Sequence, residues 1–282
     1  MLSAIPKTLQ ELSSALAEAN GETKAVAGGT DLVIRQRRGD IAPDGLIYLG
    51  VIPELREITF SEEAVRVGAM VTMRDLAAAF AGEGAYRAIA DAAAGMGTPQ
   101  IRNKATLGGN LCTASPAGDM LPVAWLYGAQ VEILDGMGRT ACLPVQEFLL
   151  GPGKTALQPS QAVTAVIFPR PKAGISAFCK IGYRENASIA RESLAGLFCL
   201  DGEKRITGAS LVLGAVGGTP IRAAEAEQYL IGREWSGNLE EQVTSMIART
   251  VHDHCRPAHR LYKTEAARGL SAQLWSLLLE RG

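Results

Sequence analysis

The stretch ATLGGNLCTASPAGD, residues 105–119, gathers glycine, proline and small hydroxyl side chains, and its only acidic residue is Asp119. Glycine lets main-chain N–H groups approach a ligand closely, and neighbouring hydroxyls add short polar groups. A second glycine pair occurs earlier, in AGGTD at 27–31. Each segment ends in an aspartate near a predicted helix start, where the helix dipole favours an anion. Both segments are therefore candidate phosphate cradles.

The spacing of the glycines excludes two common nucleotide-binding motifs. Neither segment has the G-x-G-x-x-G spacing of a Rossmann turn or the G-x-x-x-x-G-K-[ST] spacing of a P-loop. A plain alternative is that each glycine pair only makes a tight turn. The residues alone leave a dinucleotide site and two simple turns equally open.

Hydrophobic periodicity predicts alternating helices and strands on both sides of these segments. Thr8 and Glu11 form a capping pattern at the start of a helix over 8–19, and Asp31 is a candidate cap for a helix that Gly39 closes. The segment GPGKTALQPS (151–160) is interpreted as a boundary zone, so that two α+β domains divide near residue 170. Strands are expected at 24–27, 46–49, 64–71, 162–169, 176–182, 194–200 and 206–216, a hairpin at 131–145, and later helices at 222–231, 239–252 and 264–279.

Composition and charge exclude several classes of protein. The 282 residues carry 28 Lys and Arg against 29 Asp and Glu, and this balance argues against a nucleic-acid surface. No apolar run reaches the ~18 residues of a spanning helix, and the first residues lack the pattern of a signal peptide. The five cysteines form no C-x-x-C pair, so we expect most to be buried thiols in a reducing cytoplasm. The sequence predicts no metal site, because the i, i+2 spacing of His252 and His254 separates them on a helix.

An ordered series of motifs resembles one known family. The series comprises VAGGTDLVIRQRRG, IPELREI, TPQIRNKATLGGNLCTASPAGDMLP, GPGKTAL, the F-x-K-x-x-x-R-x-x-x-x-I-A run from Phe178 to Ala190, and LGAVGGTPIRAAEAEQYLIG. It is similar to the FAD-binding medium subunit of the xanthine dehydrogenase and carbon monoxide dehydrogenase family of molybdenum hydroxylases. The motifs follow the family's order over most of the chain.

The resemblance implies a fold and its domains. It implies an α+β protein with a vanillyl-alcohol-oxidase-type FAD-binding domain at 1–170, made of two α+β subdomains at about 1–57 and 58–170. A smaller C-terminal α+β domain of the CO dehydrogenase flavoprotein type would follow at 175–282. The cofactor implied is FAD.

The family's glycine loops hold the FAD pyrophosphate, and the resemblance places them at 27–32 and 106–110. The cofactor-binding residues implied are Ala27, Gly28, Gly29, Thr30, Asp31 and Leu32 in the first loop, and Thr106, Gly108, Gly109 and Asn110 in the second. Main-chain N–H donors and short polar side chains would make the contacts at both loops.

Further residues are implied at the cofactor, each with a plainer alternative. Asp119 would accept from a ribose or adenine group, or it would simply cap the next helix. Thr113 and Ser115 would bond either the ligand or their own turn. Lys180 would lie near the flavin and stabilise its reduced anion, unless it is a surface lysine on an edge strand. Arg184 would be either a cofactor neighbour or part of a structural ion pair.

Arg191 and Glu192 depart from the family pattern, which has an apolar strand there. Two interpretations are open. The pair forms a mutual salt bridge on a solvated face, or it contacts the cofactor or a partner subunit.

The resemblance also implies an activity that depends on partner chains. Electrons from a large molybdopterin subunit would cross the clusters of a small [2Fe–2S] subunit, reach FAD here and pass to NAD+ or another acceptor. The complex would be a heterotrimer that can dimerise, in the cytoplasm, with no membrane span and no nucleic acid. This chain has no [2Fe–2S] cysteine pattern and no catalytic triad, so we expect no catalytic residue of its own for hydroxylation. A free-standing flavin oxidoreductase on the same fold is the alternative.

Overall fold

The computed structural model describes residues 2–172, 174–184 and 187–281. The chain forms two compact units. The first consists of Met1–Asp75, Pro99–Ala114 and Gly128–Pro169, and the second of Leu76–Thr98, Ser115–Tyr127 and Arg170–Gly282. Residues 76–98 and 115–127 thus pack with the C-terminal part of the chain, although the sequence assigns them to the N-terminal domain.

The first unit contains two main sheets and a small hairpin. A parallel sheet has the order β1-β3-β2, and an antiparallel sheet has the order β4-β5-β10-β6-β7. Their strands and the β8–β9 hairpin are β1 Leu2–Ala4, β2 Thr23–Val26, β3 Gly45–Tyr48, β4 Ile58–Phe60, β5 Ala64–Gly68, β6 Gln130–Asp135, β7 Thr140–Pro144, β8 Leu149–Gly151, β9 Lys154–Thr155 and β10 Gln161–Pro169.

Short helices connect these strands. They are α1 Leu9–Ala17, α2 Leu32–Arg38, the 3-10 helix η1 Pro53–Arg56, α5 Pro99–Arg102, α6 Leu107–Thr113 and α8 Val145–Phe148. Leu12 and Leu16 of α1 are buried in one core cluster with Ile47 of β3, Leu55 of η1 and Leu134 of β6. Helix α3, Met73–Ala79, begins in the first unit and ends in the second.

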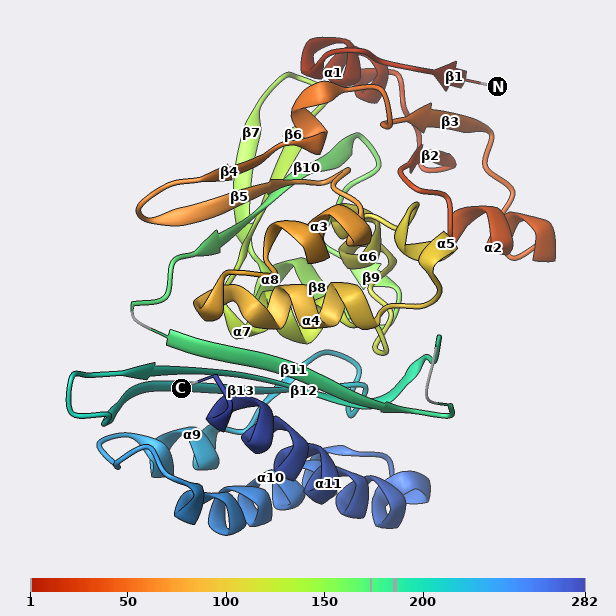
Figure 1. The fold of residues 1–282 in the computed structure, drawn as a ribbon. Helices are drawn as coiled ribbons and strands as arrows, with labels where there is room; N and C mark the ends of the chain where they lie inside the picture. Colours follow the sequence, from red (N-terminus) through yellow and green to blue (C-terminus); the bar gives the residue numbers. More distant parts are fainter. Residues whose placement is uncertain (1, 173, 185–186, 282) are drawn as a thin grey trace. The chain divides into compact units, whose positions relative to one another are not determined.

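The second unit is a four-stranded antiparallel sheet with helices on both faces (Figure 1). The sheet has the order β11-β12-β13-β14, with α4 and α7 on one face and α9 to α11 on the other. Its elements are η2 Gly84–Tyr86, α4 Arg87–Gly95, α7 Met120–Leu126, β11 Gly174–Gly182, β12 Ala190–Leu200, β13 Ile206–Gly214, β14 Ile221–Arg222, α9 Ala224–Leu230, η3 Gly237–Leu239, α10 Glu240–His254, η4 Pro257–His259 and α11 Arg260–Leu279.

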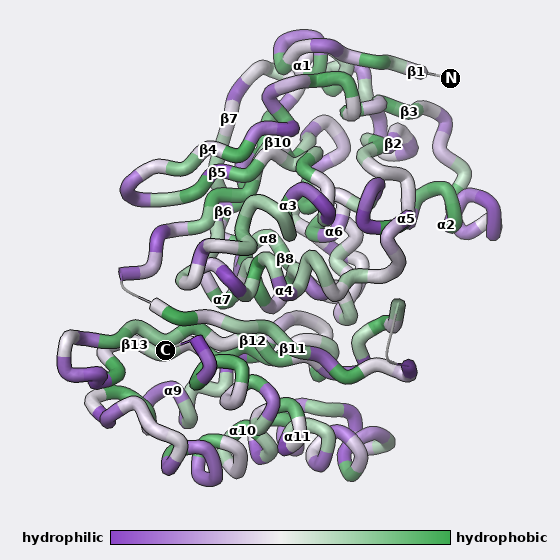
Figure 2. Tube along the Cα trace, viewed as in Figure 1, coloured by the Kyte–Doolittle hydropathy of each residue, from purple (hydrophilic) through white to green (hydrophobic). Residues whose placement is uncertain are grey.

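Hydropathy follows this layering. In Figure 2 much of the sheet is green, whereas the turn between β12 and β13 is purple. Phe198, Trp235 and Trp275 form an aromatic cluster inside this unit, with ring centroids 4.9–5.9 Å apart. Burial of such large rings supplies much of the stabilisation that this sheet and its helices need.

Several sequence predictions are confirmed. Thr8 caps α1 by accepting from the N–H of Glu11 at 3.1 Å. Gly39 ends α2 in the left-handed region at φ 78°. The predicted hairpin at 131–145 is β6 paired with β7.

Other predictions are wrong. The stretch 106–119, interpreted as a loop, contains helix α6. The boundary zone at 151–160 lies inside the first unit. The cysteines are mostly not buried, since only Cys179 and Cys255 are.

The interpretation of Arg191 and Glu192 as a mutual, solvated salt bridge is also wrong. Their side chains diverge: Arg191 stacks on tyrosine rings, and Glu192 is 0% exposed with both carboxylate oxygens unbonded to any described residue. Burial raises the pKa of Glu192 to about 7, although the charge of Lys263 opposes the rise.

Candidate functional site

The first glycine segment is an open turn with free donors. It joins β2 to α2, and Gly29 adopts φ +71°, which side chains rarely tolerate. Gly28 lies against the main chain of residue 104, because a Cβ there would sit 1.7 Å from the carbonyl oxygen of Lys104. Among the described residues, no acceptor is bonded to the N–H groups of residues 28–31. Such a row of free N–H groups suits a phosphate oxygen.

Two polar side chains of this segment also remain available. Asp31 stands at the N-cap position of α2 but makes no capping hydrogen bond, so its predicted capping role is wrong. Its carboxylate lies 3.8 Å from Arg35 in an exposed pair. The hydroxyl of Thr30 has no hydrogen bond within the described part of the chain.

The second glycine segment is the N-terminal turn of α6, and its donors are occupied. Thr106 caps the helix by accepting from the N–H of Gly109 at 3.1 Å. The N–H of Gly108 donates to Ala69 at 2.9 Å, and that of Asn110 donates to Thr106 at 2.9 Å. The motifs predicted that these N–H groups would bind a phosphate. They are not free to do so, because the protein itself accepts their hydrogen bonds.

The glycines of α6 permit close packing instead. A Cβ on Gly108 would lie 2.6 Å from the Cβ of Ala69, and one on Gly109 would lie 2.9 Å from the Thr106 hydroxyl and 3.7 Å from Ala27. The two glycine segments thus come together within the first unit. Asn110 retains one free group, because its Oδ1 is buried without a partner among the described residues.

The predicted hydroxyls at the last residue of this helix and just after it differ in their bonding. Thr113 donates to the carbonyl of Gly109 at 2.9 Å, which is a local helix bond. The main-chain carbonyl of Ser115 accepts from Gly118 at 2.8 Å and closes a turn. The Ser115 hydroxyl has no bond in the described residues, so it stays available for a ligand.

Asp119 and Lys180 form a buried ion pair in the second unit. Asp119 precedes α7 but makes no capping hydrogen bond, so the cap alternative is wrong. Its Oδ2 accepts from the ammonium of Lys180 at 2.5 Å, and the two side chains are only 5% and 14% exposed. Lys180 is therefore not a surface lysine, even though β11 is an edge strand.

One carboxylate oxygen of the pair, Asp119 Oδ1, has no hydrogen-bond partner among the described residues. Burial raises the pKa of Asp119 to about 6, and the charge and hydrogen bond of Lys180 limit the rise. Asp119 Oδ1 is buried and has no partner among the described residues. An orphaned carboxylate oxygen beside a cation can accept from a hydroxyl or an amine of a ligand.

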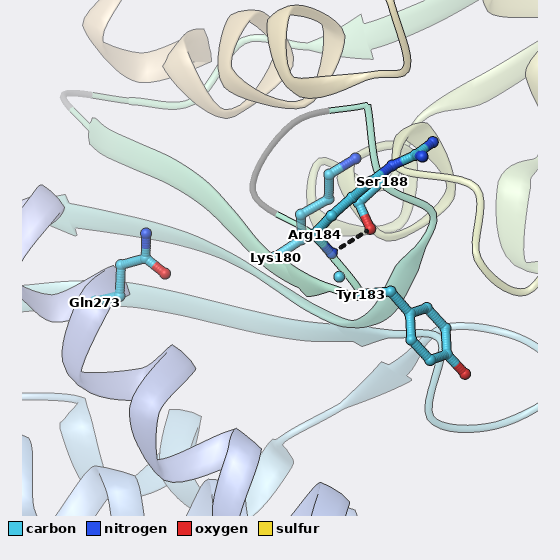
Figure 3. Close-up of a pocket in the computed structure, with 6 residues that line it drawn as sticks. Lys180, Tyr183, Arg184, Ser188 and Gln273 are labelled. Atoms are coloured by element: carbon cyan, nitrogen blue, oxygen red, sulfur yellow. Dashed lines mark hydrogen bonds between the residues drawn. The ribbon is translucent and has the colours of Figure 1, made fainter.

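A pocket of about 450 Å³ opens beside Lys180 (Figure 3). Sequence reasoning missed four of its lining residues: Gly182, Tyr183, Ser188 and Gln273. Gln273 comes from α11, about ninety positions away from Lys180, and no local pattern signals it. Arg184 lines the same pocket and donates to the carbonyl of Ala187 at 2.8 Å, and no ion pair of Arg184 exists among the described residues.

Other types of site find no support in the described residues. No group of three histidine, cysteine or acidic side chains there could hold a metal ion. His252 pairs with Asp253, and His254 contacts the carbonyl of Thr250. None of the helices in that part of the chain combines the length and apolar character that crossing a bilayer requires.

The first unit thus offers free main-chain donors at residues 28–31, and the second unit, taken by itself, offers a buried lysine and an orphaned carboxylate oxygen. The FAD binding domain of molybdopterin dehydrogenases matches residues 3–171, and the C-terminal domain of the CO dehydrogenase flavoprotein matches residues 177–278. The chain therefore belongs to the FAD-binding subunits of the molybdenum hydroxylase family, binds FAD, and is an oxidoreductase flavoprotein.

Individual relatives support this assignment. The nicotinate dehydrogenase FAD-subunit of Eubacterium barkeri is 32% identical over 282 residues, covering 98% of this chain and 95% of the relative. The xanthine dehydrogenase FAD-binding subunit of Escherichia coli O157:H7 is 32% identical over 224 residues, covering 78% of this chain and 76% of the relative.

Solved structures show the same fold. CO dehydrogenase from Oligotropha carboxidovorans matches with a TM-score of 0.89 at 23% identity, covering 100% of this chain and 98% of that chain. Quinoline 2-oxidoreductase from Pseudomonas putida 86 matches with a TM-score of 0.87 at 22% identity, covering 99% and 97%. The α+β fold with a CO dehydrogenase-type C-terminal domain, expected from the resemblance, is thereby confirmed.

Proposed function

We propose that this chain is the electron-transfer subunit of a molybdenum hydroxylase. With FAD bound, the chain would accept electrons from the [2Fe–2S] clusters of a small partner subunit and pass them to NAD+ or another acceptor, while a large molybdopterin subunit would oxidise the substrate. The curated relatives named as FAD subunits of nicotinate and xanthine dehydrogenases support this division of labour. The proposed setting is a cytoplasmic heterotrimer that can dimerise.

The observation that carries the proposal is the buried pair of Asp119 and Lys180. Asp119 compensates the charge of Lys180, but a buried ion pair adds little to the stability of a fold. Its position beside a pocket therefore supports a role of the ammonium toward a ligand. We propose that this ammonium lies near the flavin ring, where a positive charge favours the reduced anion and raises its potential. Asp119 holds the ammonium in place, and its free Oδ1 accepts from a ligand hydroxyl or amine.

The proposed contacts of the pyrophosphate follow from the two glycine segments. The N–H groups of residues 28–31 and the Thr30 hydroxyl take its oxygens, because they are unpaired in the described chain. The glycines of α6 have no side chains, and residues 106–110 can therefore pack closely against the first segment. Asn110 adds its orphaned Oδ1, which suits a donor group of the cofactor.

The test is to purify the tagged chain from its native host and, separately, to load the isolated chain with FAD. The complex should contain molybdenum, iron and flavin, and its substrate should reduce the flavin. The isolated FAD-loaded chain should pass electrons from NADH to ferricyanide but hydroxylate nothing. Hydroxylation of a purine or an aromatic acid by the isolated chain would show a free-standing enzyme instead.

The proposed role of Lys180 is tested by measuring the midpoint potential of the bound flavin. Lys180→Met should lower the flavin midpoint potential. Lys24→Met should leave it unchanged, because Lys24 is a half-buried lysine whose ammonium bonds only a main-chain carbonyl. An unchanged potential in Lys180→Met would place the ammonium away from the ring.

A further inference from the structure

Side chains cover the outer edge of β11. β12 pairs with β11 on one side, and no strand of the described chain pairs with its other side. On that outer side the N–H of Phe178 donates to Asp91 Oδ2 at 3.2 Å. The carbonyl of Ser176 accepts there from Arg281 Nη1 at 2.9 Å. Since alternate residues of an antiparallel strand turn their main-chain groups away from the partner, Asp91 and Arg281 bond the groups that a further strand would bond.

Asp91 and Arg281 are also bonded to each other by two parallel hydrogen bonds. Arg281, which follows α11, donates through Nη1 to Asp91 Oδ2 at 2.7 Å and through Nη2 to Oδ1 at 3.2 Å. Arg87, four residues before Asp91 in α4, donates its Nε to the same Oδ1 at 3.1 Å. A bidentate guanidinium holds a carboxylate in one geometry, and the two side chains are only 14% and 22% exposed. We call Asp91 and Arg281 the β11 clamp.

Helix α4 lies along β11 with an ordered series of contacts (Figure 1). The N–H of Ala88 donates to Ser176 Oγ at 3.0 Å. The β11 clamp is the next contact along the helix. One turn later, a Cβ on Gly95 would lie 3.9 Å from Cε of Lys180, so α4 passes next to the lysine stem. The clamp is thus the middle contact of the series, and it fixes the position of β11 along α4.

The position of Lys180 depends on this register. Ser176, Phe178 and Lys180 are alternate residues of β11, so their side chains lie on the same face of the sheet. A slip of β11 along α4 would therefore carry the base of the Lys180 stem away from Asp119. The stem has little freedom to compensate, because it is only 14% exposed and its ammonium bonds Asp119 at 2.5 Å.

We infer that Asp91 and Arg281 are positioning residues, which fix β11 against α4 and so hold the Lys180 ammonium at Asp119. A plainer alternative is that the clamp only covers a strand edge and adds stability. The two differ in what loss of the clamp does to Lys180. The inference rests on the proposed function for its effect on the bound flavin, because the place of Lys180 near the ring is part of that proposal.

The same sheet contains a second clamp of the same design. Glu227 accepts from the N–H of Leu211 in β13 at 2.8 Å. Arg222 donates to both oxygens of Glu227, through Nε at 3.1 Å and through Nη2 at 2.7 Å. Because β13 does not carry Lys180, Arg222→Met removes a comparable clamp and serves as the control.

The first experiment uses the full chain without FAD and measures the pKa of Asp119 by NMR of labelled aspartate. Burial raises this pKa to about 6, and Lys180 limits the rise. Arg281→Met should let the ammonium move and should raise the pKa further, as Lys180→Met should. Arg281→Lys keeps the charge but lacks the bidentate fork, so it should also raise the pKa. Arg222→Met should leave the pKa of Asp119 unchanged.

The second experiment measures the midpoint potential of the flavin in the full chain loaded with FAD. Arg281→Met should lower this potential, as Lys180→Met should but by less, whereas Arg222→Met should not. In the double variant, Arg281→Met should add nothing to the shift of Lys180→Met, because the clamp acts through that lysine. A further shift in the double variant would show that the charge of Arg281 acts directly, and it would overturn the inference.

The outcomes separate the two proposals. If Lys180→Met leaves the flavin potential unchanged, the proposed place of the ammonium near the ring fails, and the pKa of Asp119 still decides the inference. If Arg281→Met and Arg281→Lys weaken the fold in urea unfolding but change neither the pKa of Asp119 nor the potential, the clamp is only structural and the inference is overturned.

Discussion

The two glycine pairs of the first unit have similar sequences and opposite structural roles. In AGGTD the pair forms an open turn whose N–H groups are unpaired in the described chain. In TLGGN the pair lies in the first turn of α6, where Ala69, Thr106 and Val71 accept the N–H groups. The difference teaches that a glycine pair signals close approach of the backbone, and that its surroundings decide whether a ligand or the protein uses the donors.

The largest expected effect is at Gly28. Gly28→Ala would place a Cβ 1.7 Å from the carbonyl oxygen of Lys104, so the main chain must move. We expect loss of FAD binding and a loss of stability of about 3 kcal/mol, read by flavin absorbance and urea unfolding. Gly21→Ala, which has open space, is the control. Normal FAD binding in Gly28→Ala would remove this loop from the cofactor site.

The second largest effect is the pH dependence of stability at Asp119, nine residues after the TLGGN segment. Its folded pKa of about 6 is raised above the ordinary 3.8, so the folded state holds the proton more tightly. Its contribution to stability is present below about pH 4 and is lost as pH rises to about 6. Relative to the natural chain, Asp119→Asn without FAD should therefore gain about 3 kcal/mol over that range in unfolding titrations. A flat difference would place the carboxylate in water.

The third effect tests the packing role of the second pair. Gly108→Ala would bring a Cβ within 2.6 Å of the Cβ of Ala69, which should cost about 1–3 kcal/mol of unfolding free energy. FAD affinity of the folded chain should change little. Adding Ala69→Gly should recover part of the stability. Loss of FAD affinity without loss of stability would restore the N–H groups of α6 to the phosphate site.

The fourth effect is at the helix cap. Thr106→Ala removes the acceptor of the Gly109 N–H, and we expect a loss of about 1 kcal/mol in thermal or urea unfolding. Thr106→Ser keeps the hydroxyl and should retain most of the stability. Equal losses in both variants would mean that the methyl group, and not the cap, stabilises α6.

The smallest effect on stability is expected at Thr30. Its hydroxyl is unbonded in the described chain, so Thr30→Ala should change the unfolding free energy by less than about 0.5 kcal/mol. The affinity for FAD, measured by fluorescence titration, should fall by about tenfold because a bond to a phosphate is lost. An unchanged affinity would leave only main-chain groups in the cradle.

Local patterns predict a large part of this fold. Leu9, Leu12 and Leu16 mark one face of α1, and Gly39 ends α2, because periodicity and chain stereochemistry act over a few residues. Local patterns did not predict helix α6, because the groups that stabilise its first turn are distant in the sequence. Gly108 and Gly109 disfavour a helix by intrinsic propensity, and the turn forms because distant carbonyls at Ala69 and Val71 accept its N–H groups.

The candidate site shows the same limit. The motif order predicts FAD and nominates Asp119 and Lys180, but no spacing reveals that these two side chains bond each other across 61 positions. Gln273 enters the pocket from a helix that sequence reasoning did not associate with it. A residue recruited through packing leaves no periodic trace.

The sequence by itself determined the family, the cofactor, most helices and strands, and the two glycine pairs, since these depend on residue identity and short-range geometry. The tertiary structure alone decided which glycine pair keeps its donors free, which lysine pairs with Asp119, and which tyrosine rings Arg191 stacks on. Each of those outcomes depends on which distant acceptor, charge or ring lies within reach once the chain has folded.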